Sequence, residues 1–135
     1  MTPDARPSMP NAVHQSTPVG SPHAAYAELH CLTNFTFLRG ASHPEELVER
    51  ASALGYTALA ITDECSMAGV VKAHIAAKRC QLKLIIGNEL TLEDGTKIIL
   101  LAKNRQGYGE LCHIITLARR RAKKGQYQVT LKDFK

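Results

Sequence analysis

The chain has 135 residues and a formal net charge of +5, with the 44% hydrophobic and 21% charged content of an ordinary folded domain. No apolar stretch approaches the roughly 20 residues needed to cross a bilayer, and no hydrophobic signal region follows the first methionine. The four cysteines are scattered without a C-x-x-C pair, so the sequence predicts reduced thiols in a cytoplasmic protein, with neither a zinc knuckle nor a disulfide framework.

Residues 1–24 differ in composition from the rest of the chain. They hold five of the six prolines, spaced by Ser, Thr, Asn and His, and they contain few large apolar side chains. Such a segment cannot bury enough apolar surface to offset the entropy lost on ordering. We therefore expect a disordered leader over residues 1–24 and a folded region over residues 25–135.

The first half of the folded region alternates strand and helix signals. Residues 26–32 are a predicted strand, and residues 58–62 are an apolar run typical of a strand covered on both faces. Between them, Ser42 and Glu45 form an S-x-x-E capping box, which predicts a helix that ends at Gly55. Ser66 is the predicted cap of a second helix that extends to about Arg79.

The second half continues with a third predicted strand over residues 82–87. The order β, α, β, α, β up to this point implies parallel strands with right-handed crossovers. Residues 90–102 then predict a hairpin around an Asp-Gly turn, and residues 107–124 predict a third helix closed by Gly125. Thr130 and Asp133 predict a further cap, whose element the chain does not complete, so we expect this chain to be a piece of a longer protein.

The three predicted strands each deliver polar side chains to their carboxyl ends: His30 near the end of the first, Asp63 and Glu64 after the second, and Glu89 after the third. In α/β barrels this edge carries metal sites and acid–base pairs. Capped helix starts and solvated strand ends give the same pattern without any chemistry, and fold alone does not decide between the two interpretations.

Six segments carry a family resemblance: 30–33, 40–48, 60–70, 86–89, 100–102 and 107–108. They resemble the N-terminal PHP (polymerase and histidinol phosphatase) domain of bacterial family C DNA polymerases, and in detail the error-prone branch of that family. The resemblance begins near Tyr26 and continues to the end of the chain. It implies an α/β fold made of the first β/α units of a distorted (β/α)7 barrel, here incomplete.

The sequence departs from the metal-binding pattern of active PHP domains at three positions. Leu32 stands where the family has the second histidine of H-x-H, Arg39 where it has an aspartate, and Glu64 where it has the histidine of T-D-H. Only His30, Asp63 and Glu89 keep the family's identities, so we expect no metal at this remnant site and no catalytic residue in this chain.

Arg39 raises a hypothesis of charge substitution. If its guanidinium occupies the space that a divalent ion fills in active relatives, it would neutralise some combination of Asp63, Glu64 and Glu89 through planar bidentate hydrogen bonds. The domain would then be structural. The alternative is that Arg39 points into solvent.

Positive charge is concentrated at the end of the chain, where residues 103–135 carry nine Lys or Arg against two acidic residues. The basic run has two interpretations: contact with a nucleic-acid backbone in a parent enzyme, or solvated charges that compensate the helix dipole. Few aromatic residues interleave with these charges, so a platform for stacking single-stranded bases is not predicted. The run comprises Arg119, Arg120, Arg121, Lys123 and Lys124.

The resemblance implies a parent protein that is an error-prone, DNA-directed DNA polymerase acting in translesion synthesis, DNA repair and replication. Such a nucleotidyltransferase would use Mg²⁺, DNA and deoxynucleoside triphosphates, and would meet a sliding clamp and accessory translesion proteins. A metal-dependent PHP phosphoesterase and a stand-alone binding module are the alternatives. Leu32 and Glu64 disfavour the phosphoesterase, and the open sheet edge of an incomplete barrel disfavours the module.

Overall fold

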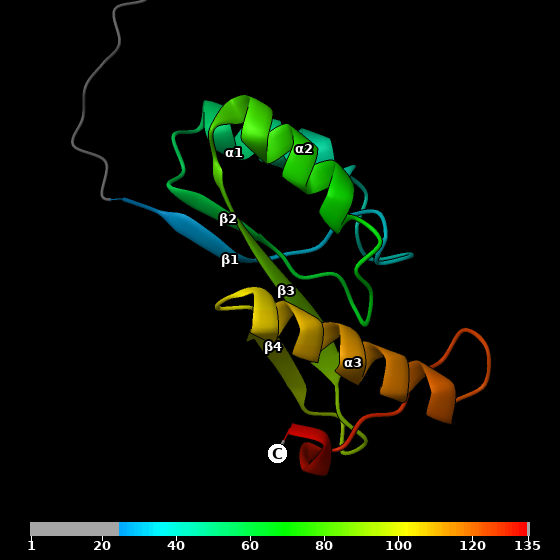
Figure 1. Cartoon of the computed structure of the whole chain (residues 1–135). Helices are drawn as coiled ribbons and strands as arrows, with labels where there is room; N and C mark the ends of the chain where they lie inside the picture. Colours follow the sequence, from blue (N-terminus) through cyan, green and yellow to red (C-terminus); the bar gives the residue numbers. More distant parts are fainter. Residues whose placement is uncertain (1–24, 135) are drawn as a thin grey trace, which may run out of the picture.

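The computed structural model describes residues 25–134. Four strands and three helices follow one another along the chain, with a short 3₁₀ helix at the end (Figure 1). The predicted leader over residues 1–24 lies outside the described residues. The elements are β1 (Ala27–Cys31), α1 (Pro44–Ala53), β2 (Ala58–Ile61), α2 (Val70–Cys80), β3 (Lys83–Thr91), β4 (Lys97–Leu101), α3 (Arg105–Arg121) and η1 (Leu131–Phe134).

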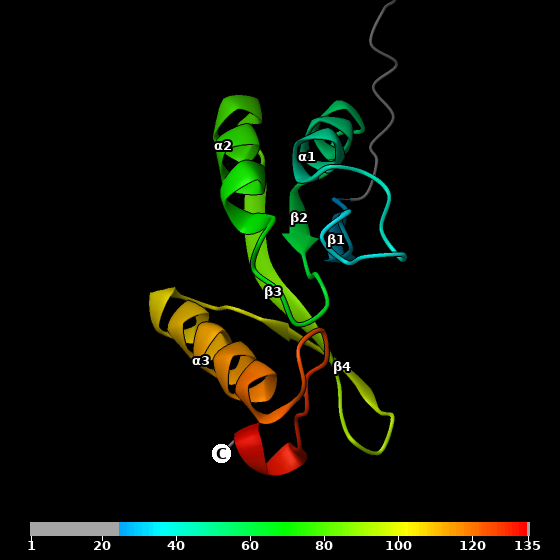
Figure 2. The ribbon, with the colours of Figure 1, turned by 90° about the vertical axis from the view of Figure 1, so that its right-hand side faces the viewer.

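The strands form one sheet in the order β1-β2-β3-β4. β1, β2 and β3 are parallel, as the alternation of strands and helices predicts, and β4 returns antiparallel to the second half of β3. All four residues of β2 are buried, which agrees with its unbroken apolar sequence. Figures 1 and 2 show α1 and α2 side by side over the parallel half of the sheet, with α3 over the β3–β4 half.

Two separate hydrophobic clusters hold the two halves of the sheet to their helices. The first joins α1 and α2 to β2 and includes Val48, Leu59 and Ile61. The second joins α3 to the β3–β4 hairpin and includes Leu90 and Ala118.

The start and end of α1 show how local sequence sets its bounds. The helix begins one residue later than predicted: His43 is the N-cap, and its backbone N–H donates to Glu46 Oε2 at 2.8 Å, so the expected Ser42–Glu45 box is displaced by one position. Its end follows the prediction, because Gly55 has a φ of 75° and donates its N–H to the carbonyl of Ser52, as in a Schellman motif.

Two predicted boundaries in the middle of the chain are wrong. The third strand does not end at residue 87 but runs on to Thr91, because β4 supplies antiparallel partners for its second half. The second helix starts at Val70 and not at Ser66. In place of a first helical bond between them, the Ser66 carbonyl accepts from Asn88 Nδ2 at 2.9 Å and the Val70 N–H donates to the Met67 carbonyl at 3.2 Å.

The last third of the chain follows its predicted signals with shifted bounds. The hairpin turn forms at Asp94 and Gly95, where Gly95 has a φ of 86°. α3 begins after Asn104, whose side chain accepts a hydrogen bond from Gly107 N at 2.9 Å, and it ends at Arg121, three residues earlier than expected. Asp133 Oδ2 accepts a 2.8 Å hydrogen bond from the backbone N–H of the residue before η1, which confirms the predicted cap.

None of the helices in residues 25–134 is both long enough and apolar enough to span a membrane.

Candidate functional site

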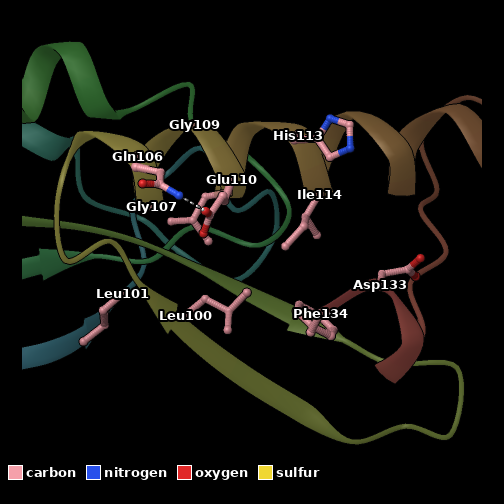
Figure 3. Close-up of a pocket in the computed structure, with 11 residues that line it drawn as sticks. Leu100, Leu101, Gln106, Gly107, Gly109, Glu110, His113, Ile114, Asp133 and Phe134 are labelled. Carbon is pink, nitrogen blue, oxygen red and sulfur yellow. Dashed lines mark hydrogen bonds between the residues drawn. The ribbon is translucent and has the colours of Figure 1, made fainter.

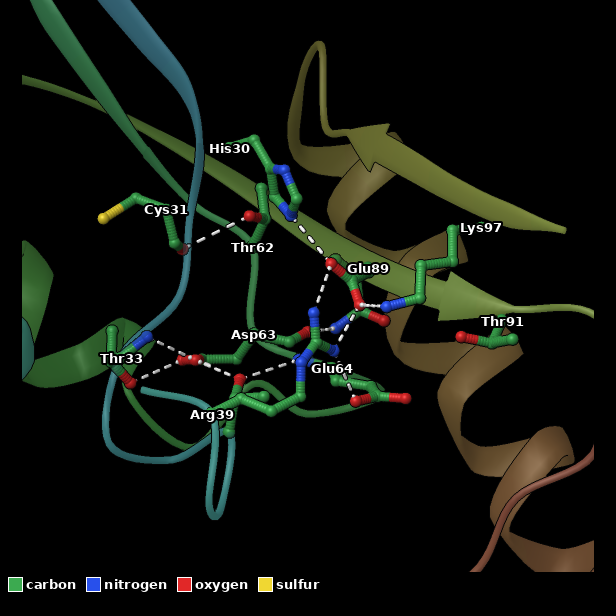
Figure 4. A network of polar contacts seen from close by, with 12 residues as sticks. His30, Cys31, Thr33, Arg39, Thr62, Asp63, Glu64, Glu89, Thr91 and Lys97 are labelled. Carbon is green, nitrogen blue, oxygen red and sulfur yellow. Dashed lines mark hydrogen bonds and ion pairs between the residues drawn. The ribbon is translucent and has the colours of Figure 1, made fainter. Parts of the chain in front are cut away.

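The structure brings together three of the four polar residues expected at the carboxyl ends of the strands (Figure 4). His30 lies on β1, Glu64 follows β2, and Glu89 lies within β3. Glu64 and Glu89 are paired by an isolated parallel β-bridge. Arg39 reaches them from the loop between β1 and α1. We call this cluster of His30, Arg39, Glu64 and Glu89 the strand-end cluster.

The Arg39 guanidinium is the centre of the strand-end cluster. Its Nη1 lies 2.7 Å from Glu64 Oε2 and also donates to Glu89 Oε1, and its Nη2 lies 3.2 Å from Glu89 Oε2. The planar fork therefore binds one carboxylate with both nitrogens and a second carboxylate with one of them. Arg39 thus lies between two carboxylates, whereas the alternative placed it in solvent.

Glu89 is the buried member of the cluster, with 1% of its side chain exposed. Besides Arg39, it contacts His30 Nε2 at 2.8 Å and Lys97 Nζ at 3.6 Å. Hydrogen bonds from Arg39, opposed in part by burial and assisted by His30, lower the pKa of Glu89 from 4.5 to about 2. Contact with Glu89 and Glu64 raises the pKa of Arg39 above its already high usual value. The pair is therefore charged throughout the physiological pH range.

Asp63 does not belong to the strand-end cluster, although it adjoins Glu64 in sequence. Its carboxylate is buried and accepts three hydrogen bonds from the β1–α1 loop: from Thr33 N at 2.7 Å, Thr33 Oγ1 at 2.8 Å and Thr36 Oγ1 at 2.7 Å. The hypothesis that Arg39 neutralises some combination of acids is thereby narrowed to Glu64 and Glu89. Asp63 instead holds the loop that carries Arg39.

A tyrosine that sequence reasoning missed completes the environment of Glu64. Tyr127 Oη donates to Glu64 Oε1 at 2.7 Å and accepts from Thr91 N at 2.9 Å. Sixty-three residues separate Tyr127 from Glu64, so no spacing rule would have found this contact. Lys97 was missed for a similar reason, because only the antiparallel return of β4 brings it to Glu89.

All five cations of the predicted basic run are exposed, and two of them make contacts inside the domain. Arg119 donates to the Cys65 carbonyl at 3.1 Å through Nη2 and lies over the Tyr127 ring, with 5.3 Å from its guanidinium carbon to the ring centroid. Arg121 pairs with Asp133 at 2.8 Å. The other three are Arg120, Lys123 and Lys124, of which Lys123 and Lys124 lie beyond the end of α3.

The strand-end cluster does not fit a divalent metal ion. In the part of the chain that the structure describes, no group of three or more His, Cys, Asp and Glu side chains is arranged to hold a metal. The two carboxylates that face each other are bridged by a guanidinium, which repels a cation. The half-buried Leu32 carries only an alkyl side chain, which supplies no electron pair to a metal.

A separate pocket lies on the other side of the β3–β4 hairpin, between α3, β4 and η1 (Figure 3). It has a volume of about 750 Å³ and is lined by apolar side chains such as Leu100, Ile114 and Phe134, with Glu110 and His113 at its rim. None of the residues of the strand-end cluster lines it. No pattern in the sequence indicated this pocket.

Comparison with known proteins settles the family. A family model described as PHP domain matches residues 28–134, which is most of the chain. The chain belongs to the PHP domain family. The match spans β1 through η1, so the whole strand-end cluster lies inside the PHP domain.

Curated relatives of this PHP domain carry the name error-prone DNA polymerase. That of Dechloromonas aromatica is 65% identical over 108 residues, and that of Methylococcus capsulatus is 62% identical over 109 residues. These alignments cover 80% and 81% of this chain but only 10% of either relative. The chain therefore spans about a tenth of the length of the relatives that it matches.

Two solved structures share the fold. A putative metal-dependent phosphoesterase from Bifidobacterium adolescentis superposes with a TM-score of 0.52 at 29% identity, covering 73% of this chain and 36% of that one. An amidohydrolase from Chromobacterium violaceum, with bound sulfate and no metal, superposes with a TM-score of 0.58 at 26% identity, covering 71% and 34%. Together with the curled, partly parallel sheet, these confirm the predicted fold class.

The ion pairs of Arg39 predict a measurable contribution to stability. Arg39→Ala leaves Glu89 buried with only His30 and Lys97 nearby, so we expect the free energy of unfolding to fall by about 2 kcal/mol. The matched control is Arg79→Ala, because Arg79 pairs with Glu49 while both side chains are more than half exposed. That control should change stability by less than about 0.5 kcal/mol. Urea titration of the purified chain measures both, and an unchanged Arg39→Ala protein would contradict the role of the pair.

The lowered pKa of Glu89 predicts a pH dependence. A carboxyl group whose pKa falls from 4.5 to about 2 on folding stabilises the protein above pH 4.5, and this stabilisation is lost as the pH falls toward 2. The stability difference between the wild type and Glu89→Gln should therefore shrink by an amount on the order of 3 kcal/mol across this window. Urea titrations of both proteins at several pH values test this. A difference that stays constant below pH 4.5 would show that Glu89 titrates normally.

Proposed function

We propose that this chain is the N-terminal part of an error-prone DNA polymerase, in which the PHP domain has a structural role. The parent enzyme adds deoxynucleotides to DNA ends with Mg²⁺ and extends DNA across damaged templates. The observation that carries the proposal is the 57–65% identity to error-prone DNA polymerases over about 80% of the chain. The polymerase active site would lie in the remainder of the parent protein.

The structural role of the PHP domain is supported by the charge balance of the strand-end cluster. The buried carboxylate of Glu89 needs a nearby cation, and the guanidinium of Arg39 supplies it from the protein itself. A domain that neutralises its own carboxylates keeps its shape without taking up an ion.

The partners of the parent follow from this proposal. They are DNA and deoxynucleoside triphosphates, a sliding clamp, and accessory translesion proteins, in the cytoplasm. Within this chain, the three exposed cations at the end of α3 are available to a phosphate backbone, whereas Arg119 and Arg121 are held by contacts inside the domain.

A metal-dependent phosphoesterase is the second candidate, favoured by the structural likeness to a putative enzyme of that kind. Against it stand the guanidinium between Glu64 and Glu89 and the alkyl side chain of Leu32. A metal-activated water requires ligands that these positions do not provide.

The test is primer extension by the complete product of the gene. We expect the purified protein to extend a primed template with deoxynucleoside triphosphates and Mg²⁺, and to continue past an abasic site. The chain of residues 1–135 alone should extend nothing. Absence of extension by the complete product, together with metal-dependent release of phosphate from a phosphomonoester, would replace the polymerase proposal by the phosphoesterase.

A further inference from the structure

The loop between β1 and α1 ends in an exposed apolar tip. Phe37 is 84% exposed and Leu38 is 90% exposed, the highest values among the exposed large hydrophobic residues of the described chain. Figure 2 shows this loop, in cyan, projecting away from the sheet and helices. Two large apolar side chains held together in water are costly, and such surfaces mark contact sites.

The base of the loop is fixed on both sides. Asp63 accepts hydrogen bonds from Thr33 and Thr36, and Arg39 is held by Glu64 and Glu89. The two ends of the loop also meet: a Cβ added to Gly40 would lie 1.9 Å from the carbonyl oxygen of Thr33. The tip is therefore presented by a rigid base.

The backbone at the tip is strained at Leu38 and closed into a hydrogen-bonded turn. Leu38 has a φ of 63°, a left-handed conformation that is unfavourable for a bulky residue. The turn around it is closed by hydrogen bonds from Arg39 N and Gly40 N to the carbonyl of Thr36, at 3.1 and 3.0 Å. Preorganisation of this kind lowers the entropic cost of binding a partner.

The charges around the tip favour a protein partner over nucleic acid. Arg39 is the only cation in residues 33–40, and its guanidinium is already bound by two carboxylates. Binding to a phosphate backbone depends on cations that are free to contact it. An apolar tip without a free cation is suited to an apolar pocket.

We propose that Phe37 and Leu38 insert into an apolar pocket formed by the portion of the same polypeptide beyond residue 135. This rests on the proposed function. About nine tenths of the length of the curated relatives lies outside the matched region, so most of the surface that the PHP domain meets belongs to that portion. The 24 residues before the domain contain no Leu, Ile, Phe, Tyr or Trp and are poorly suited to form the pocket.

Photo-cross-linking of the complete gene product tests this insertion. A protein with Phe37→p-benzoylphenylalanine should form, on irradiation, cross-links within one polypeptide to peptides beyond residue 135, identified by mass spectrometry. The matched control is Val71→p-benzoylphenylalanine, because Val71 is a 67% exposed apolar residue on α2. The control should not cross-link to those peptides.

A second pair of variants gives an independent readout. Phe37→Ser with Leu38→Ser should lower the Tm of the complete protein by at least about 2 °C, since it removes two buried contacts. Val71→Ser with Ile75→Ser, at two exposed positions of α2, should leave the Tm unchanged.

Four outcomes overturn the insertion: cross-links to DNA, cross-links between two copies, the same peptides from position 71, or no cross-link with an unchanged Tm. Primer extension is measured on the same preparations. A polymerase that extends primers but shows one of these outcomes refutes only the insertion, whereas a protein without extension refutes the proposed function.

Discussion

The ion pair between Arg39 and Glu89 is the interaction on which the carboxyl end of the sheet depends. A carboxylate with 1% of its side chain exposed has lost its water, and an uncompensated charge in that position costs several kcal/mol. His30 and Lys97 approach it, but only the guanidinium forms a two-nitrogen contact. The guanidinium of Arg39 lies between Glu64 and Glu89 and neutralises them, which allows the strand ends that carry these acids to lie close together.

The same interaction organises the parts around it. Arg39 anchors the β1–α1 loop to Glu64, and Thr33 and Thr36 anchor the same loop to Asp63. The two adjacent acids Asp63 and Glu64 therefore hold one loop at different places. Glu64 also accepts a hydrogen bond from Tyr127, which lies in the segment after α3. Two hydrophobic clusters that share no residue are thus joined through a polar network.

Helix ends and buried strands that depend on neighbouring residues alone were predicted correctly from the sequence. Gly55 ends α1 as a left-handed glycine must, and the unbroken apolar run of β2 is buried on both faces. The continuation of β3 past residue 87 was not predictable, because it depends on pairing with β4. The late start of α2 was not predictable either, because the Ser66 carbonyl is bound by Asn88, a residue of β3 that is distant in the sequence.

The candidate site was predictable in part, for the same reason. Parallel strands deliver their carboxyl ends to one edge, which is why His30, Glu64 and Glu89 were expected together and are found together. Adjacent residues on an extended chain point to opposite sides, so Asp63 separates from Glu64. Tyr127 and Lys97 reach the cluster through tertiary packing, which the sequence does not encode in any spacing.

The measurement that tests the substitution of a guanidinium for an ion most directly is the free energy of unfolding of the purified chain with a chelator and with excess Mn²⁺. An ion that binds only the folded state raises the free energy of unfolding, and at concentrations above its dissociation constant the increase grows with the logarithm of the ion concentration. Mn²⁺ is preferred to Zn²⁺ because zinc also binds cysteines and histidines of the unfolded chain. We predict identical unfolding curves in both conditions. A stabilisation by Mn²⁺, with one ion retained per chain, would contradict the account.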